Sequence, residues 1–141
     1  MATDVDSALP SSNLAPTVGE VMRPATTTVE SGAHLAGAAY LMKHSGDTAL
    51  VVTTSDPHPR PIAVLTDTDI SQAVADGRNL EETRISDLPP RDPVVVDPGT
   101  DVLSAARTML LHRIHHLPVV ENGRLVGIVD MADVCRPLVG S

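Results

Sequence analysis

The chain has 141 residues and a formal net charge of −8, from 18 acidic and 10 basic side chains. This balance argues against an extended contact with a nucleic-acid backbone, and a single Tyr with no Phe or Trp excludes a stacking platform for unpaired bases. We expect a cytoplasmic protein without a membrane partner, because there is one cysteine, no signal-like start and no apolar run near the roughly 18 residues that span a bilayer.

The first half of the chain alternates short apolar segments with turn residues. Residues 1–16 mix Ser, Asp, Ala and Pro without a period, which predicts a disordered tail. Thr17 and Glu20 have the spacing of a capping box, so a short helix follows, and Pro24 ends it. We then predict a strand at 26–29, a helix at 31–44, strands at 49–53 and 62–65 around a proline-rich loop, and a helix from Asp67 to Ala75 ended by Gly77.

The second half replays this order. Asn122-Gly123 predicts a type I′ hairpin turn between two strands. The elements that we predict are a short turn at 85–88, a strand at 94–96, a helix at 100–112, strands at 117–120 and 125–129, and a last helix at 131–138 that Pro137 frays.

The two halves are copies of one repeat. The apolar pattern Leu35, Ala38, Ala39, Met42 returns 67 residues later as Val102, Ala105, Ala106, Met109, and after the insertion at 56–61 the offset falls to 64. A repeat of about 60 residues buries too little surface to be stable alone. We therefore expect one α+β domain built from two pseudo-symmetric repeats, residues 17–78 and 84–139, after the tail at 1–16.

The duplicated arrangement resembles the CBS domain, whose tandem pair is the Bateman module. The likeness lies in the repeated β-α-β-β-α order, in the run from His116 to Val120, and in Gly127-Ile128-Val129 ahead of a helix. It covers about residues 17–139. The resemblance implies a disc-like module whose repeats pack through their sheets, with two clefts in which many relatives bind AMP, ADP, ATP or S-adenosylmethionine.

Thr66 and Asp69 carry the ligand motif that the resemblance implies, a Ser or Thr followed three residues later by Asp. Thr66 lies where a strand gives way to a helix, so its hydroxyl is placed to donate to a phosphate. The Asp69 carboxylate is able to accept two hydrogen bonds from a ribose diol. The same spacing equally fits a helix cap, in which Asp67 and Asp69 favour the positive end of the helix, and both readings stay open.

The second repeat departs from this motif, because Asp130 stands in place of the Ser or Thr and Asp133 in place of Asp69. The Asp130 carboxylate lies where a phosphate would sit, and two like charges in a half-buried cleft are unfavourable unless a metal ion intervenes. We therefore expect a degenerate site that is empty or takes a ligand without phosphate there. The first repeat departs less: Thr68 stands where many nucleotide-binding relatives have Arg, which weakens the expected hold on phosphate.

Positive charge for a phosphate is expected from the run that leaves the second long helix. Arg113 is able to form a bidentate phosphate contact, and His115 and His116 add donors; the alternative is a solvated helix end. A metal site at these histidines is a weak hypothesis, and we expect none. With so few aromatics, the adenine is expected to pack on small and aliphatic side chains, namely Thr26, Thr27, Ala49 and Val51.

These observations predict a regulatory module that senses an adenosine-containing nucleotide (AMP, ADP or ATP, with S-adenosylmethionine less favoured) and changes its homodimer or partner interactions. We find no nucleophile–base pair, Walker loop or dinucleotide fingerprint, so we expect neither an enzyme nor a required cofactor. The alternative is an interaction protein whose ligand sites are both degenerate. Its contacts to a second copy or an unknown protein partner would lie near 70–74 and 134–138.

Overall fold

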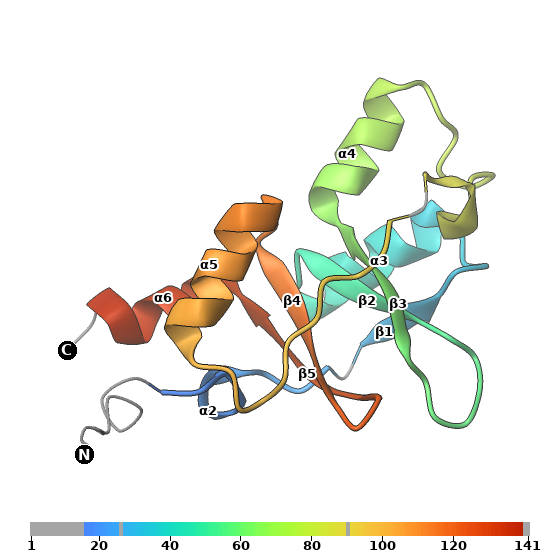
Figure 1. Ribbon diagram of the computed structural model, residues 1–141. Coiled ribbons are helices and arrows are strands. Elements are labelled where there is room, and N and C mark those ends of the chain that lie inside the picture. The colour runs from blue at the N-terminus through green and yellow to red at the C-terminus, as the bar shows by residue number, and fades with distance from the viewer. Residues whose placement is uncertain (1–15, 26, 90, 140–141) are drawn as a thin grey trace, which may run out of the picture. The chain divides into compact units, whose positions relative to one another are not determined.

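The computed structural model describes residues 16–25, 27–89 and 91–139 (Figure 1). This part of the chain divides into two compact units. The first-repeat unit holds residues 25–94 and 123–125, and the second-repeat unit holds residues 16–24, 95–122 and 126–139. The tail predicted at 1–16 lies, except for Pro16, outside the described residues. No helix among the described residues is both long and apolar enough to pass through a membrane.

The first-repeat unit is a three-stranded sheet with two helices. Strand β1 pairs in parallel with β2, and β2 pairs antiparallel with β3, giving the order β1-β2-β3. Leu50 and Val52 of β2 pack into the core of this unit with Leu35 of the first long helix. The elements are β1 (Thr28–Glu30), α3 (Leu35–Ser45), β2 (Ala49–Thr53), β3 (Pro61–Thr66) and α4 (Asp67–Ala75).

These bounds confirm the predicted elements of the first repeat, with shifts of more than one residue at the starts of α3 and β1 and one-residue shifts at other ends. The helix expected from Ser31 begins instead at Leu35, because residues 31 and 32 form a turn. The strand expected from Thr26 begins at Thr28, and Thr26 itself is not among the described residues. Helix α4 has the predicted bounds, and Gly77 follows it in the left-handed conformation with φ +80°.

The second-repeat unit contains α2 (Val18–Val21), α5 (Val102–His112), β4 (His116–Glu121), β5 (Arg124–Asp130, apart from its first two residues) and α6 (Met131–Val139). Helix α6 packs against α5 and α2 (Figure 1). The turn between the strands has φ values of 53° at Asn122 and 78° at Gly123, as the predicted type I′ turn requires. Helix α6 continues past Pro137 to Val139, one residue further than predicted.

The strand predicted at 94–96 is wrong: only Val96 pairs, in a single parallel bridge to Val119. This bridge repeats the Val29–Val52 pair of the first-repeat unit, where a strand does form. Val96 donates to the Pro118 carbonyl and accepts from the Val120 N–H. Extending this parallel ladder toward Val94 would require a hydrogen bond from the N–H of Pro118. Extending it past Val96 would require one from the N–H of Pro98. Proline has no N–H, so the ladder stops at one bridge.

Each unit is completed by the segment that precedes the other repeat. We call residues 16–24 and 83–88 the leading segments. Val18 donates to the Thr100 carbonyl (2.7 Å), and its counterpart 67 residues on, Ile85, donates to the Ala33 carbonyl (2.9 Å). The bonds from Val102 to Pro16 and from Leu35 to Thr83 are a second such pair, at 3.1 and 2.8 Å. The short 3₁₀ helix η2 (Ile85–Asp87) therefore belongs to the first-repeat unit, and α2 to the second-repeat unit.

Candidate functional site

Thr66 and Asp69 form a reciprocal cap at the start of α4. The Asp69 N–H donates to Thr66 Oγ1 (3.2 Å), and Asp69 Oδ2 accepts from the Thr66 N–H (2.9 Å) and from Thr66 Oγ1 (3.1 Å). The capping interpretation of this motif is thus confirmed. Asp67, the first residue of α4, is exposed and donates its N–H to the Thr48 carbonyl. The ligand roles of all three residues stay predictions.

The second oxygen of Asp69 is held by an arginine that the sequence did not single out. Arg91 Nη2 donates to Asp69 Oδ1 at 2.9 Å, within the first-repeat unit. The Arg91 side chain is 69 % exposed and that of Asp69 is 19 % exposed. Asp69 therefore uses one oxygen for the cap and the other for an ion pair that solvent reaches.

Ala49 and Val51 of β2 lie on the same face of the sheet as Thr66 of β3. In the strand register Ala49 lies opposite Thr66, and Val51 lies opposite Val64. Cross-strand neighbours point to the same side of a sheet, and this side is opposite to the one that carries Leu50. Ala49 and Val51 are both buried, at 6 % and 1 % exposure. Thr27, just before β1, is partly exposed, and the adenine-lining role of these residues remains a prediction.

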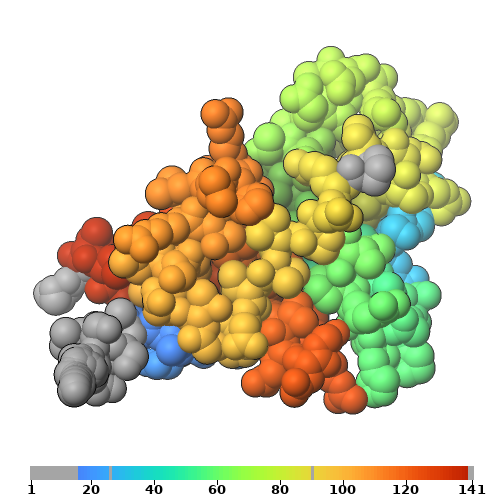
Figure 2. Space-filling model, viewed as in Figure 1, coloured from blue at the N-terminus to red at the C-terminus, as the bar shows by residue number. Residues whose placement is uncertain are grey.

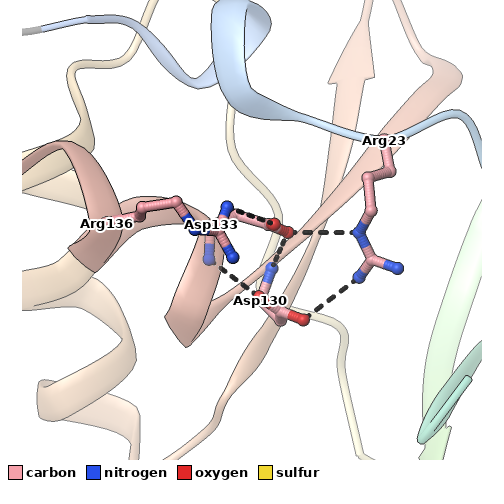
Figure 3. A network of polar contacts seen from close by, with 4 residues as sticks. All are labelled: Arg23, Asp130, Asp133 and Arg136. Carbon is pink, nitrogen blue, oxygen red and sulfur yellow. Dashed lines mark hydrogen bonds and ion pairs between the residues drawn. The ribbon is translucent and has the colours of Figure 1, made fainter. Parts of the chain in front are cut away.

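In the second repeat, Asp130 performs the capping role that Thr66 performs in the first. The Asp133 N–H donates to Asp130 Oδ1 (2.8 Å), and the Asp130 N–H donates to Asp133 Oδ2 (2.9 Å). The two carboxylates thus lie together at the start of α6 (Figure 3). A carboxylate accepts from a backbone N–H as readily as a hydroxyl does, so the substitution preserves the cap while adding a negative charge.

Arg23 of the leading segment compensates this charge. Its Nη2 donates to Asp130 Oδ2 (3.2 Å) and its Nε to Asp133 Oδ2 (3.3 Å), and Arg136 Nη1 lies 3.8 Å from Asp133 Oδ1 (Figure 3). Burial raises the pKa of Asp130, but the N–H and side chain of Asp133, Arg23 and His116 together hold it below its ordinary value. The sequence analysis did not anticipate that the Arg23 guanidinium contacts both carboxylates. The described residues contain no cluster of three or more potential metal ligands.

Three of the predicted phosphate donors, Arg113, His115 and His116, lie in the second-repeat unit, whereas Thr66 and Asp69 belong to the first-repeat unit. Arg113 ends α5 in the left-handed conformation (φ 57°) and is exposed. His115 is exposed, and its carbonyl accepts from the Met131 N–H. His116 begins β4 and lowers the pKa of Asp130. Their role toward a phosphate on the first repeat stays a prediction.

Arg23 and Arg91 are the residues that the sequence analysis missed. Their partners lie 107 and 110 residues away for Arg23, and 22 residues away for Arg91, so no local spacing reveals them. One signal was available: Arg91 lies within one residue of the position 67 residues after Arg23. The same 67-residue offset relates the two repeats.

Comparison with known proteins gives the family. A sequence profile of the CBS domain matches residues 18–76 and 85–140. The homoserine O-acetyltransferase of Methanococcoides burtonii is 34 % identical over 120 residues, which is 84 % of this chain and 23 % of that enzyme. The chain spans less than two thirds of its curated relatives, between 15 % and 61 % of four others.

Solved structures agree with this match. The CBS-domain protein ATU1752 from Agrobacterium tumefaciens superposes with a TM-score of 0.79 at 25 % identity, over 94 % of this chain and all of that one. The CBS domain protein PAE2072 from Pyrobaculum aerophilum, solved in complex with AMP, gives a TM-score of 0.74 at 30 % identity, over 84 % and 90 % of the two chains. The α+β fold expected for two tandem repeats is confirmed.

Proposed function

The chain belongs to the CBS domain family, and from that premise we propose that it is a regulatory module that binds an adenosine nucleotide of the AMP, ADP and ATP class at Thr66 and Asp69. The observation that carries the proposal is the difference between the two motifs. In the first repeat a neutral hydroxyl and an exposed arginine accompany the aspartate, whereas in the second an arginine bridges two carboxylates. The relative that was solved with AMP supports the ligand class.

Each residue of the site has a chemical task in this proposal. Asp69 Oδ1 accepts from the ribose hydroxyls, and the Thr66 hydroxyl donates to a phosphate oxygen at the N-terminus of α4. Asp67 adds to the negative charge near the ribose. The adenine packs on aliphatic and small side chains of the sheet face. The remaining members of the proposed site are Thr26, Thr27, Ala49, Val51, Arg113, His115 and His116.

Occupation of the site is proposed to act by shifting a population of homodimeric or partner-bound states, since a ligand moves an equilibrium only through its unequal affinity for the two states. The role is regulatory rather than catalytic. The match to an acetyltransferase does not argue for catalysis, because it covers 23 % of that enzyme.

A thermal-shift panel with AMP, ADP, ATP, S-adenosylmethionine and NADH tests the proposal. A ligand at 100 times its dissociation constant stabilises the folded state by about 2.7 kcal/mol. We expect Asp69→Asn to abolish the shift while keeping much of the cap, because an amide oxygen still accepts hydrogen bonds. Asp76→Asn, at the exposed C-terminal end of the same helix, is the charge-matched control. The absence of any shift in the wild type, or an undiminished shift in Asp69→Asn, refutes the proposed site.

A second candidate function is that of an interaction protein without a ligand. Its support is the exposure of Leu110 (70 %) and Leu111 (79 %) near the end of α5, a helix that lies open on the face in Figure 2. Val74 and Leu138, in the two predicted contact segments, are 56 % and 43 % exposed. Light scattering on the full chain tests this candidate. A monomer at every concentration that binds no partner counts against it, whereas a dimer that Leu110→Ser dissociates supports it.

A further inference from the structure

The first-repeat motif has a charge problem that the proposed function must solve. Asp67 and Asp69 bring two negative charges to the start of α4, and Thr68 between them is neutral. A phosphate placed beside Thr66 would meet both carboxylates. The dipole of a nine-residue helix offsets only part of this repulsion, because its effect amounts to about half a charge at the N-terminus.

Arg91 is the basic side chain that the structure places at this motif. It comes from the stretch of chain after η2, and its bond to Asp69 Oδ1 lies wholly within the first-repeat unit. Thr66 contacts the other oxygen of the same carboxylate. The guanidinium and the hydroxyl therefore lie on the two sides of one carboxylate group.

The Arg91 guanidinium is able to leave Asp69 for another partner more easily than the Arg23 guanidinium is able to leave its two carboxylates. Arg91 contacts Asp69 through one nitrogen and is 69 % exposed, whereas Arg23 contacts two carboxylates through two nitrogens. Exposed pairs of this kind contribute little to stability, so replacing the partner costs little. A guanidinium has five N–H donors in a planar fork, which suits the oxygens of a phosphate.

We propose that Arg91 selects for a phosphate-bearing ligand at the Thr66/Asp69 site. In the empty site it neutralises Asp69. When the ribose hydroxyls take Asp69 Oδ1, the guanidinium turns its donors to the phosphate that Thr66 also contacts. This inference rests on the proposed function, and it supplies the positive charge that Thr68 does not.

Calorimetric titration of the full chain with AMP and with adenosine tests the inference. We expect Arg91→Ala to weaken AMP binding about tenfold or more, because a charge-assisted hydrogen bond is lost, and to change adenosine binding less than about twofold. Arg91→Lys is expected to be intermediate, since lysine offers a point charge without the fork. Added salt weakens AMP binding more in the wild type than in Arg91→Ala.

Arg78→Ala is the matched control, because Arg78 is an exposed arginine of the same unit at the turn after α4. It is expected to leave both affinities unchanged, and melting curves confirm that each variant folds. Equal AMP affinity in Arg91→Ala and the wild type overturns the inference. So does an equal loss of AMP and adenosine, which would give Arg91 a role in holding Asp69 alone. If the wild type binds neither ligand, the proposed function itself fails.

Discussion

Asp69 and Asp133 are equivalent aspartates whose surroundings give them different weights in the stability of the protein. Both accept from the backbone N–H three residues earlier, and both meet an arginine from outside their own helix. The Asp133 side chain is 9 % exposed and shares Arg23 with Asp130, whereas the Asp69 side chain is 19 % exposed and pairs with Arg91. Removing the carboxylate therefore leaves different groups without partners.

We expect Asp133→Ala to lower the free energy of unfolding by about 2 kcal/mol, because the partly buried Asp130 N–H and the bridging Arg23 guanidinium both lose an acceptor. Asp69→Ala is expected to cost about 1 kcal/mol, the usual cost of a lost helix cap. Urea unfolding of the full chain measures both. Equal losses would show that the burial of Asp133 and its shared arginine add nothing.

Asp130 gives the molecule a pH dependence at the acid end. Its pKa lies below the ordinary value, despite burial that raises it, so its contribution to stability is complete above about pH 4 and is lost as the pH falls through the folded-state pKa. We expect Asp130→Asn, which keeps an acceptor for the cap, to lose less stability than the wild type between about pH 4 and pH 2. Urea midpoints across this range test it, with Asp76→Asn as control. Parallel acid limbs would contradict the expectation.

At the scale of elements, the leading segment 16–24 is held against β5 by a close backbone approach. A Cβ at Gly127 would lie 2.7 Å from Met22 Sδ and 2.9 Å from the Arg23 carbonyl oxygen. The Arg23 backbone also pairs with Ile128 in a two-bond bridge. Glycine at this position is thus a condition for the contact that brings the Arg23 side chain to Asp130 and Asp133.

Gly127→Ala is expected to lower the free energy of unfolding by about 1–3 kcal/mol, as other substitutions that force a packed backbone apart do. Gly37→Ala is the contrasting variant. Gly37 lies in α3, and a Cβ there meets nothing within 4 Å. It is expected to raise stability by about 0.5 kcal/mol, because alanine loses less backbone entropy in a helix. Chemical unfolding of the two variants decides; a loss of equal size in both would refute the steric argument.

Elements whose signal is local were predictable. The capping boxes at Thr17 and Thr66 and the turn at Asn122 each involve residues within four positions of one another, so the sequence contains the whole interaction. The absence of a strand at 94–96 was not predictable in this way. Its loss depends on Pro118, a residue of the partner strand, and a pattern within the segment itself carries no trace of that.

The candidate site divides in the same way. The Thr66–Asp69 and Asp130–Asp133 pairs follow from a spacing of three, but the arginines that reach them come from other parts of the chain. Arg23 comes from the leading segment 16–24 and Arg91 from the stretch after η2, and the periodicity of either repeat does not encode how these stretches pack. The charges of the motif alone therefore do not show that an arginine neutralises Asp130.

At the scale of the whole molecule, each leading segment belongs to the unit of the other repeat, and this predicts which parts of the chain unfold together. Ile85 packs in the core of the first-repeat unit, and Val18 is fully buried in the second-repeat unit. We expect Ile85→Ala, at a cost of about 2–4 kcal/mol, to speed amide hydrogen exchange mainly in residues 27–89. Val18→Ala is the reciprocal variant and should act mainly on 95–122 and 126–139. Faster exchange mainly in the second-repeat unit for Ile85→Ala, or mainly in the first-repeat unit for Val18→Ala, would contradict this.

The connectivity of the two units determines where the chain can be divided in a truncation or a domain transplant. Within the described residues, the first-repeat unit is an almost continuous stretch, 25–94, and the chain of the second-repeat unit passes on either side of it. In this sense the first-repeat unit is nested inside the second, as an inserted domain is in its host. A transplant or deletion designed at the repeat boundary near residue 80 would carry away a segment that the remaining half needs. Junctions after residues 24 and 94 would keep each hydrophobic core with the leading segment that packs on it.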